Sequence, residues 1–405
     1  MFQPKNILSF INRQQNLRKK MKNKITWINF IHIYQPPWQQ RGVIEQVASE
    51  SYEYLFVLLE RHRNFRCTLN ITGNLIEQLE TVRPDLIKEL QKAVKRGQVE
   101  LTGTAKYHAL LPLLSDYEIR RQIELNKEVL AKYFDLRKIK GFYLPEMAYS
   151  YRVAKIVKQT GFSWLILDSI NYKGDLDENT FYKIKKLGLK LVFRDRMISK
   201  SYPAEVIFNK IKKDFPEQTI VSATDGEIYG HFHQDWQGHL EKVLQSEQVK
   251  VLSVSDYFKK AKKFESIELR DASWESTEKE LKKNIAYALW NDPKNKIHKL
   301  LWALVGLASE LVYKHRRDKN FIWARRHLDK GLSSCTFWWA SAKKPSDFSP
   351  LTWNPDMIDN GSEELVRSVR SLEKASTKEK IKAEKLYIEI KKNTWLDHWS
   401  KYNKK

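Results

Sequence analysis

Two carboxylates with a similar local setting are the first candidates for chemistry in this chain. Glu146 ends the run Gly141-Phe-Tyr-Leu-Pro-Glu146, and Asp225 ends the run Thr219-Ile-Val-Ser-Ala-Thr-Asp225. Each run begins as a short apolar stretch of the kind that predicts a buried β-strand. Cleavage of a glycosidic bond needs such a pair, with one carboxylate as nucleophile or base and the other as acid. Carboxylates at strand ends also cap helices, so the pair alone leaves both interpretations open.

Histidines lie close to both carboxylates and to the other apolar runs. His32 follows the first run, His108 lies in the loop after the third, and His231 and His233 follow Asp225. A single histidine at a strand end is usually a structural hydrogen-bonding residue. Several histidines that converge with two carboxylates indicate either a metal site or an acid–base site for a sugar.

The elements that must position these side chains are short strands that alternate with helices. The seven predicted strands are 25–31, 65–70, 99–102, 141–144, 164–167, 189–193 and 219–222. Alternation of this kind predicts parallel pairing through right-handed crossovers. Nearly every predicted strand ends in, or is followed by, a polar residue. In a β/α barrel, the active site lies at the C-terminal ends of the strands. These polar residues are His32, Asn70, Glu146, Asp168, Arg194 with Asp195, and Asp225.

An open doubly wound sheet would use only the strand ends near its switch point. Polar ends on all the strands therefore favour a closed or nearly closed barrel. We predict the α/β class, with a distorted TIM-like (β/α)7 barrel over residues 21–265. Long helical patterns follow over 278–289, 296–313, 321–332 and 362–392, with almost no β-rich runs. They predict a helical domain over 266–405 that packs on the barrel mouth. Residues 1–20 are polar and basic, and we expect a disordered extension there.

Composition excludes several classes of protein. The 405 residues are 42% hydrophobic and 30% charged, which allows a substantial core and excludes a disordered or coiled-coil chain. No apolar run approaches the ~18–20 residues of a membrane span. The net charge is 72 − 49 = +23. The lysines are spread along helical stretches that also carry Glu, and zinc-finger spacing is absent from the sequence, so we expect no nucleic-acid partner. Two cysteines favour a reducing, cytoplasmic location.

Five segments, taken in order, carry a resemblance to a known family. They are His32-Ile-Tyr34-Gln35-Pro, Gly103 with His108 five residues later, Tyr143-Leu-Pro-Glu146, Asp225-Gly-Glu227-Ile-Tyr-Gly-His231, and Ser334-Cys-Thr-Phe-Trp338-Trp339. Together they resemble the motifs of glycoside hydrolase family 57, α-glucan-acting enzymes with a seven-stranded β/α barrel. One difference is Tyr34, which stands where the family motif has its second histidine.

The resemblance implies a retaining mechanism on α-1,4-glucans or maltooligosaccharides. Glu146 would be the nucleophile and Asp225 the general acid and base, with the two carboxyl groups ~5–5.5 Å apart and the pKa of Asp225 raised by repulsion from Glu146. No cofactor and no metal are expected. α-Amylase-like hydrolysis and 4-α-glucanotransfer use the same two carboxylates, so both activities remain open.

The resemblance also places other side chains near the substrate. Glu227 would orient the two carboxyl groups, or it is a solvated loop residue. Arg194 and Asp195 would contact sugar hydroxyls, or they form a structural ion pair. The aromatic residues would stack on glucose rings, with core packing as the alternative, and Trp338 and Trp339 cannot both face the pocket from one helix. The expected substrate-binding set is His32, Tyr34, Gln35, Trp38, His108, Arg194, Asp195, Glu227, His231, His233, Trp338 and Trp339.

Two other classes compete with this interpretation. A metal-dependent carbohydrate deacetylase typically needs an aspartate and two histidines four residues apart, and no two of the ten histidines have that spacing. A glucan-binding protein with a decayed site would not need Glu146 and Asp225, although Tyr34 is a change of the kind that decay would produce. A metal assay distinguishes the first alternative, and a turnover assay distinguishes the second.

Overall fold

The computed structural model describes residues 25–213, 217–345 and 351–402, so the expected extension over 1–20 lies outside the described residues. The described strands form one sheet of ten. They are β1 Ile25–Ile33, β2 Cys67–Ile71, β3 Val99–Gly103, β4 Gly141–Phe142, β5 Trp164–Asp168, β6 Tyr182–Ile184, β7 Lys190–Arg194, β8 Gln218–Asp225, β9 Val249–Leu252 and β10 Glu265–Ile267.

The sheet curls into a nearly closed barrel. Its strand order is β10-β6-β7-β5-β4-β3-β2-β1-β8, and β9 pairs with the first half of β1. All pairings are parallel except that of β6 with β7. At the remaining gap, the backbone N–H of Asp195 after β7 donates to the carbonyl of Val221 in β8 at 2.7 Å. The seven predicted strands are β1 to β5, β7 and β8, so the predicted α/β barrel is confirmed.

Three strands were not predicted. β6, β9 and β10 have only three or four residues each, and each includes a charged residue (Lys183, Lys250 or Glu265), so none stands out as an apolar run in the sequence. The predicted strands are easier to see because they are buried on both faces. All nine residues of β1, Ile-Thr-Trp-Ile-Asn-Phe-Ile-His-Ile, are buried between the barrel interior and the helical layer.

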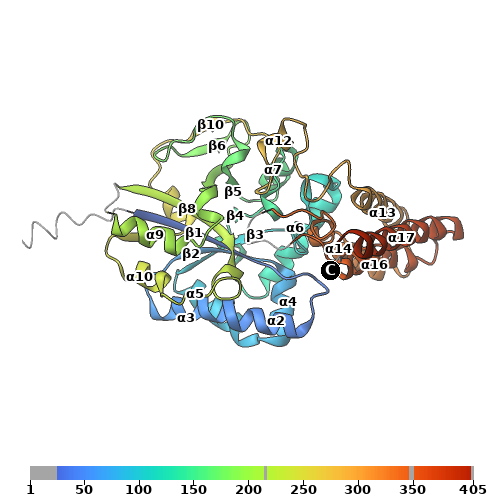
Figure 1. Ribbon diagram of the computed structural model, residues 1–405, viewed down its shortest axis with the longest axis horizontal. Coiled ribbons are helices and arrows are strands. Elements are labelled where there is room, and N and C mark those ends of the chain that lie inside the picture. The colour runs from blue at the N-terminus through green and yellow to red at the C-terminus, as the bar shows by residue number, and fades with distance from the viewer. Residues whose placement is uncertain (1–24, 214–216, 346–350, 403–405) are drawn as a thin grey trace, which may run out of the picture.

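Helices between the strands cover the outside of the barrel, with α2 to α5 along one side in Figure 1. Side chains of the sequence fix where several of them begin; the Ser115 hydroxyl accepts from the Glu118 N–H at the start of α6, for example. The helices of this layer are α2 Arg41–Val47, α3 Glu53–Arg61, α4 Gly73–Val82, α5 Pro84–Lys95, α6 Asp116–Ala131, α7 Tyr151–Gln159, α8 Arg196–Ser199, α9 Pro203–Lys212, α10 His239–Gln245 and α11 Val254–Phe258.

A helical region follows the barrel and lies beside the ends at which the strands finish (Figure 1). It consists of α12 Glu278–Leu281, α13 Lys296–Lys314, α14 Phe321–Gly331, α15 Ser334–Trp338, α16 Pro355–Arg370 and α17 Thr377–Asp397. The helix expected over 278–289 ends at Leu281. The helix expected over 362–392 is two helices, because a capping box of Ser376 and Glu379 begins α17 separately.

The predicted domain boundary between residues 265 and 266 falls inside β10, which pairs with β6. The division into a barrel domain and a helical domain stays a prediction. None of the helices in the described parts of the chain combines the length and the apolar composition that a membrane crossing requires.

Candidate active site

Polar side chains from the strand ends meet at the barrel end that faces the helical region. The strand register places His32 of β1 beside Asp225 of β8 on one side and beside Asn70 of β2 on the other. His32 Nδ1 lies 2.8 Å from Asn70 Oδ1. Asp168 and Arg194, at the ends of β5 and β7, are register partners too. The barrel therefore brings together residues that the sequence separates by as many as 193 positions, as for His32 and Asp225.

Glu146 lies at the centre of this group and is buried. It follows β4 with φ 60° and ψ 17°, a left-handed conformation that L-residues rarely adopt, and His108 and Met147 also have positive φ. Two donors hold its carboxylate: Ser334 Oγ at 2.9 Å from Oε1, and Trp274 Nε1 at 3.0 Å from Oε2. Strained backbone of this kind clusters at functional sites, where the surrounding structure maintains it.

The carboxyl groups of the site hold their protons tightly. Burial raises the pKa of Glu146 to about 8, the hydrogen bond from Ser334 opposes the rise, and the charge of Asp225 adds to it. Asp225 is exposed at the barrel mouth, yet desolvation by the protein groups around it raises its pKa, against the effect of Arg194. The expected rise in the pKa of Asp225 is thus present, but its main cause is desolvation rather than repulsion from Glu146.

Glu227 is buried close to Asp225 and is not a solvated loop residue. Its Oε1 accepts from Tyr52 Oη at 2.6 Å and from Gln35 Nε2 at 3.2 Å. Burial is the main cause of its raised pKa, and the charge of Asp225 is the second. Three carboxyl groups with raised pKa values therefore share the site, so their protonation states depend on one another.

A stack of four rings forms one wall of the site. Tyr34, His108, His32 and Tyr143 follow one another with ring centroids 4.4, 4.8 and 4.4 Å apart. Burial lowers the pKa of His32 to about 4 and that of His108 well below its ordinary value, so both imidazoles are neutral at pH 7. His108 Nδ1 lies 2.9 Å from Ser334 Oγ, the same hydroxyl that donates to Glu146.

Tyr34 occupies the place of the family histidine and contacts the helical region. Its hydroxyl lies 2.6 Å from Ser333 Oγ, and Cys335 Sγ donates to it at 3.5 Å. The Ser334 N–H donates to the His108 carbonyl at 3.1 Å, which anchors the first residue of α15 to the barrel. The aromatic ring at position 34 therefore joins the first strand end to the start of α15.

Arg194 forms a structural ion pair. Its Nε donates to Asp168 Oδ2 at 2.7 Å, both side chains are buried, and the guanidinium lies 5.0 Å from the ring centroid of Trp274. Its remaining nitrogens donate to the Ala223 and Trp274 carbonyls. The expected alternative of an ion pair with Asp195 is wrong, because Asp195 instead caps α8 by accepting from the Ile198 N–H at 2.9 Å. Substrate contacts of Arg194 and Asp195 stay predictions.

Three other predicted residues are engaged with protein groups at the edge of the site. His231 Nδ1 lies 2.5 Å from Glu50 Oε2, and the ring of His233 lies 4.4 Å from that of Tyr202. Trp38 Nε1 donates to Met357 Sδ of α16 at 3.1 Å. Their predicted contacts with a sugar remain untested.

Trp338 and Trp339 are both half-buried and pack edge to face, with centroids 4.5 Å apart and planes at 80°. Phe337 beside them is fully buried and stacks on Trp302. Position 337 therefore belongs to the core, whereas the two tryptophans keep part of their surface accessible. Their role as a sugar platform stays a prediction.

Sequence reasoning missed Trp274, Ser334 and Tyr52 as site residues. Ser334 opens the fifth motif, so its position could have suggested a polar role. Trp274 lies where the strand–helix alternation ends, and Tyr52 lies inside a helical stretch; neither position shows a local pattern that points to the site. Among the residues described, no three His, Cys, Asp or Glu side chains are grouped as a metal site. The expectation of a metal-free reaction stays a prediction.

β/α-barrel enzymes place their active sites at the C-terminal ends of the strands, which is where the acidic residues of this chain converge. The chain belongs to glycosyl hydrolase family 57, whose family model matches residues 7–270. The recognition made from the five motifs is therefore confirmed.

The chain is similar to curated proteins named α-amylase and 4-α-glucanotransferase. An α-amylase of Pyrococcus furiosus is 31% identical over 153 residues, 38% of this chain and 23% of that protein. A 4-α-glucanotransferase of Thermococcus litoralis is 23% identical over 259 residues, 58% of this chain and 39% of its own. The chain thus spans less than half the length of these curated relatives.

Solved structures show the same fold over most of the chain. The crystal structure of the T. litoralis 4-α-glucanotransferase has a TM-score of 0.68 at 18% identity, over 87% of this chain and 60% of that one. A family 57 branching enzyme from Pyrococcus horikoshii has a TM-score of 0.66 at 14% identity, over 90% of this chain and 94% of that one. At such identities the likeness establishes the architecture alone.

Proposed function

We propose that this protein cleaves α-1,4-glucans or maltooligosaccharides by a retaining double displacement and passes the glycosyl group to water or to another sugar. One observation carries the proposal. Glu146 is buried at the barrel mouth, held by two hydrogen-bond donors, and close enough to Asp225 for the charge of Asp225 to raise its pKa. Membership of family 57 supports the substrate class.

In the first step the Glu146 carboxylate attacks the anomeric carbon, the bond to the leaving oxygen breaks, and Asp225 gives that oxygen its proton. In the second step, water or a sugar hydroxyl attacks the same carbon and releases Glu146, while Asp225 accepts the proton. Asp225 must begin protonated, and its raised pKa supports that role. Glu146 must begin ionised, and the donors on Ser334 and Trp274 stabilise its ionised form.

The raised pKa of Glu146 has a consequence for this mechanism. With a pKa of about 8 in the free enzyme, most molecules carry a protonated nucleophile at pH 7. The reactive form, with Glu146 ionised and Asp225 protonated, is a minor species there. The positive charge that develops on the sugar ring in the oxocarbenium-like transition state favours this form, because it attracts the carboxylate.

The acid role is tested by replacing Asp225 with Asn and comparing substrates. We expect a loss of several orders of magnitude on maltooligosaccharides, and a much smaller loss of the first step on glucosides whose leaving group needs no protonation. Glu146→Gln should lose activity on both substrates and serves as the comparison. An equal loss on the two substrates for Asp225→Asn would contradict the acid role.

Hydrolysis and transfer differ in what reaches the glycosyl-enzyme. Product analysis on maltoheptaose separates them, because transfer makes longer chains and hydrolysis makes only shorter ones. We place α-amylase-like hydrolysis first, with 4-α-glucanotransfer as the alternative. The decayed-site alternative predicts no turnover on any α-glucan, and the deacetylase alternative predicts activity that requires zinc.

A further inference from the structure

The hydroxyl of Ser334 lies between two side chains at the barrel end and has a single proton to share between them. Its Oγ is 2.9 Å from Glu146 Oε1 and 2.9 Å from His108 Nδ1. Nδ1 and Oε1 are 3.6 Å apart, which is too far for a hydrogen bond, so the contact between them runs through Ser334. Glu146, Ser334 and His108 therefore form a hydrogen-bond relay.

The two charge states of Glu146 require opposite directions of hydrogen bonding in the relay. An ionised Glu146 only accepts, so Ser334 donates to it, and His108 must carry its proton on Nδ1 in order to donate to Ser334. A Glu146 protonated on Oε1 donates to Ser334, which then donates to Nδ1, so the imidazole carries its proton on Nε2. The carboxyl proton belongs on Oε1, because Oε2 accepts from Trp274 Nε1, which can only donate.

The barrel and α15 hold His108 and Ser334 in place for this exchange. The Ser334 N–H donates to the His108 carbonyl at 3.1 Å, so the two residues are joined through the backbone as well as through their side chains. His108 has φ 54°, a left-handed conformation that the surrounding structure must maintain. Its ring is stacked between those of Tyr34 and His32, with centroids 4.4 and 4.8 Å away. The plane of the imidazole is therefore fixed.

The second nitrogen of His108 leaves the tautomer of the ring free to change. His108 is buried, and its Nε2 makes no hydrogen bond to any residue within the described ranges. The tautomer of a histidine is ordinarily set by such a bond at one of its two nitrogens. Here only the bond at Nδ1 can set it, and the direction of that bond follows the charge of Glu146.

We propose that His108 is a positioning residue that acts on Glu146 through Ser334, and that its ring proton moves between the two nitrogens as Glu146 gains or loses its charge. Loss of one proton from the relay reverses both hydrogen bonds. The carboxyl proton passes to Ser334, the Ser334 proton passes to Nδ1, and the Nε2 proton is released to the solvent. The coupling belongs to the folded protein, whereas its use in catalysis rests on the proposed function.

Most titratable residues packed against the relay keep one charge state from pH 5 to pH 9. Burial lowers the pKa of His32 to about 4 and that of His108 well below its ordinary value, so both rings are neutral. Burial also raises the pKa of Cys335 to about 12, and those of Tyr34 and Tyr143 well above their ordinary value. A change of tautomer in this range therefore cannot come from these groups.

The neighbouring carboxyl groups act on the relay through their charges. Those of Asp225 and Glu275 raise the pKa of Glu146, and the charge of Arg194 lowers the pKa of Asp225. Glu227, whose pKa is raised by burial, interacts with Asp225 in turn. Because Asp225 and Glu227 titrate themselves, the experiment has to separate their effects from that of Glu146.

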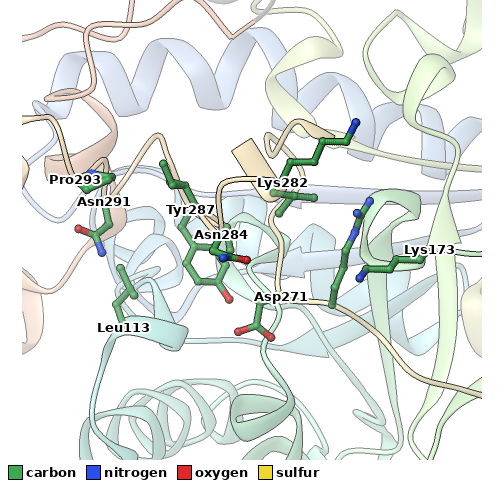
Figure 2. A pocket seen from close by; sticks show the side chains of 12 residues that line it. Leu113, Lys173, Asp271, Lys282, Asn284, Tyr287, Asn291 and Pro293 are labelled. Carbon is green, nitrogen blue, oxygen red and sulfur yellow. The ribbon is translucent and has the colours of Figure 1, made fainter. Parts of the chain in front are cut away.

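A separate cavity lies outside the relay. It has a volume of about 680 Å³, and its lining includes the charged residues Lys173, Asp271 and Lys282 (Figure 2). None of the three relay residues lines it, so a ligand in this cavity would not touch the relay. Lys282→Ala removes one of these charges and should leave the pH dependence of the His108 tautomer unchanged.

The experiment reads the tautomer of His108 by NMR in the full-length protein, labelled with nitrogen-15 in its histidines. A protonated and a bare ring nitrogen resonate far apart, and a spectrum of His108→Asn identifies the signals of His108 by their loss. As pH rises from 5 to 9, we expect Nδ1 to change from bare to protonated and Nε2 to change the other way, with a midpoint near the pKa of Glu146, about 8. Ring nitrogens with the same signals at pH 5 and pH 9 would overturn the proposal.

Two substitutions show which carboxyl group drives the change. In Glu146→Gln the amide oxygen must turn to Trp274, so the amide NH₂ donates to Ser334 as a protonated Glu146 would. His108 should then keep its proton on Nε2 at every pH. Asp225→Asn removes a neighbouring charge, so the change should remain and its midpoint should move to lower pH. A change of tautomer that persists in Glu146→Gln would also overturn the proposal.

Replacement of His108 tests whether the coupling serves catalysis. Asn places an amide near the position of Nδ1 and tolerates the left-handed backbone, whereas Leu has a similar outline but no hydrogen-bonding group. Bonds that support a charged group are the stronger ones, so His108→Leu disfavours the ionised form of Glu146. We expect kcat/KM per folded molecule at pH 7 to fall roughly three- to tenfold in His108→Leu, as for one lost hydrogen bond, and less in His108→Asn.

A double substitution distinguishes this role from direct contact with substrate. In a Ser334→Ala background, His108→Leu should cost nothing further in kcat/KM, because His108 acts through the Ser334 hydroxyl. Losses that add would show that His108 acts by another route and would overturn the positioning role.

The NMR result does not depend on turnover, so the two proposals can fail separately. A tautomer that follows Glu146, in a protein that turns over no α-glucan, would keep the coupling and refute the catalytic proposal. Turnover of maltoheptaose by a protein whose His108 tautomer ignores pH would keep the catalytic proposal and refute the coupling.

Discussion

Replacing Glu146 with Gln should change how the stability of the protein depends on pH. The pKa of Glu146 is about 8 in the folded protein, against 4.5 for the unperturbed group. Between these two values the unfolded chain loses the proton while the folded protein keeps it. The free energy of unfolding therefore falls as pH rises, by at most about 1.4 kcal/mol per pH unit from this group. Glutamine does not titrate, so the variant lacks this contribution.

The variant should thus gain stability relative to the wild type from pH 5 to pH 8. A constant offset of about 1 kcal/mol in the other direction is expected, because the glutamine amide cannot accept from both Ser334 and Trp274. Urea unfolding at pH 5, 6, 7 and 8 measures the difference, and the offset cancels when the pH values are compared.

Glu128→Gln is the control, since Glu128 is an exposed carboxylate on α6 whose loss also removes one negative charge. A difference between wild type and Glu146→Gln that stays constant from pH 5 to pH 8 would refute the argument. It would mean that burial does not hold the proton on Glu146, and the electrostatic account of the site would fail with it.

Three further results are expected. Ser334→Ala removes a hydrogen bond that lowers the pKa of Glu146, so kcat/KM should fall roughly ten- to hundredfold and its acidic limb should move to higher pH; an unshifted pH profile would count against this contact. Arg194→Ala leaves the buried Asp168 with only the more distant Arg196, at 3.6 Å, as a cationic partner, which should cost about 3 kcal/mol and lower Tm markedly, whereas an unchanged Tm would disprove the structural ion pair. Activity should survive excess chelator, because the two-carboxylate mechanism uses no metal; loss that zinc restores would move the assignment to the deacetylase class.

The barrel could be predicted because its strands are marked by short patterns of neighbouring residues in the sequence. β1 is a long, mostly apolar run and β8 is rich in β-branched residues, and a polar residue near the end of each marks where the strand finishes. The same rule identified Glu146 and Asp225 before any spatial information was available. β6, with three residues and a lysine at its centre, does not stand out as an apolar run and could not be found this way.

The environment of the carboxylates could not be predicted, because it depends on contacts between distant segments. Ser334 is 188 residues from Glu146, and Trp274 is 128 residues away. From the sequence we expected repulsion between two charges to raise the pKa of Asp225. How deeply each carboxyl group is buried depends on how the whole barrel end is assembled, so it could not be predicted. Burial falls mainly on Glu146, whereas Asp225 stays exposed.

The contacts of Ser334 also bear on how such an enzyme can be divided or recombined. The barrel strands and both carboxylates lie within the first 270 residues, yet the hydroxyl that bonds to Glu146 belongs to the helical region. A fragment that ends at residue 270, or a chimera that exchanges the helices for those of a relative, would retain both acidic residues. It would lose the Ser334 hydroxyl, whose hydrogen bond favours the ionised form of Glu146. The barrel strands alone therefore lack a group that bonds to Glu146, and a successful exchange would have to carry α15 together with the barrel mouth.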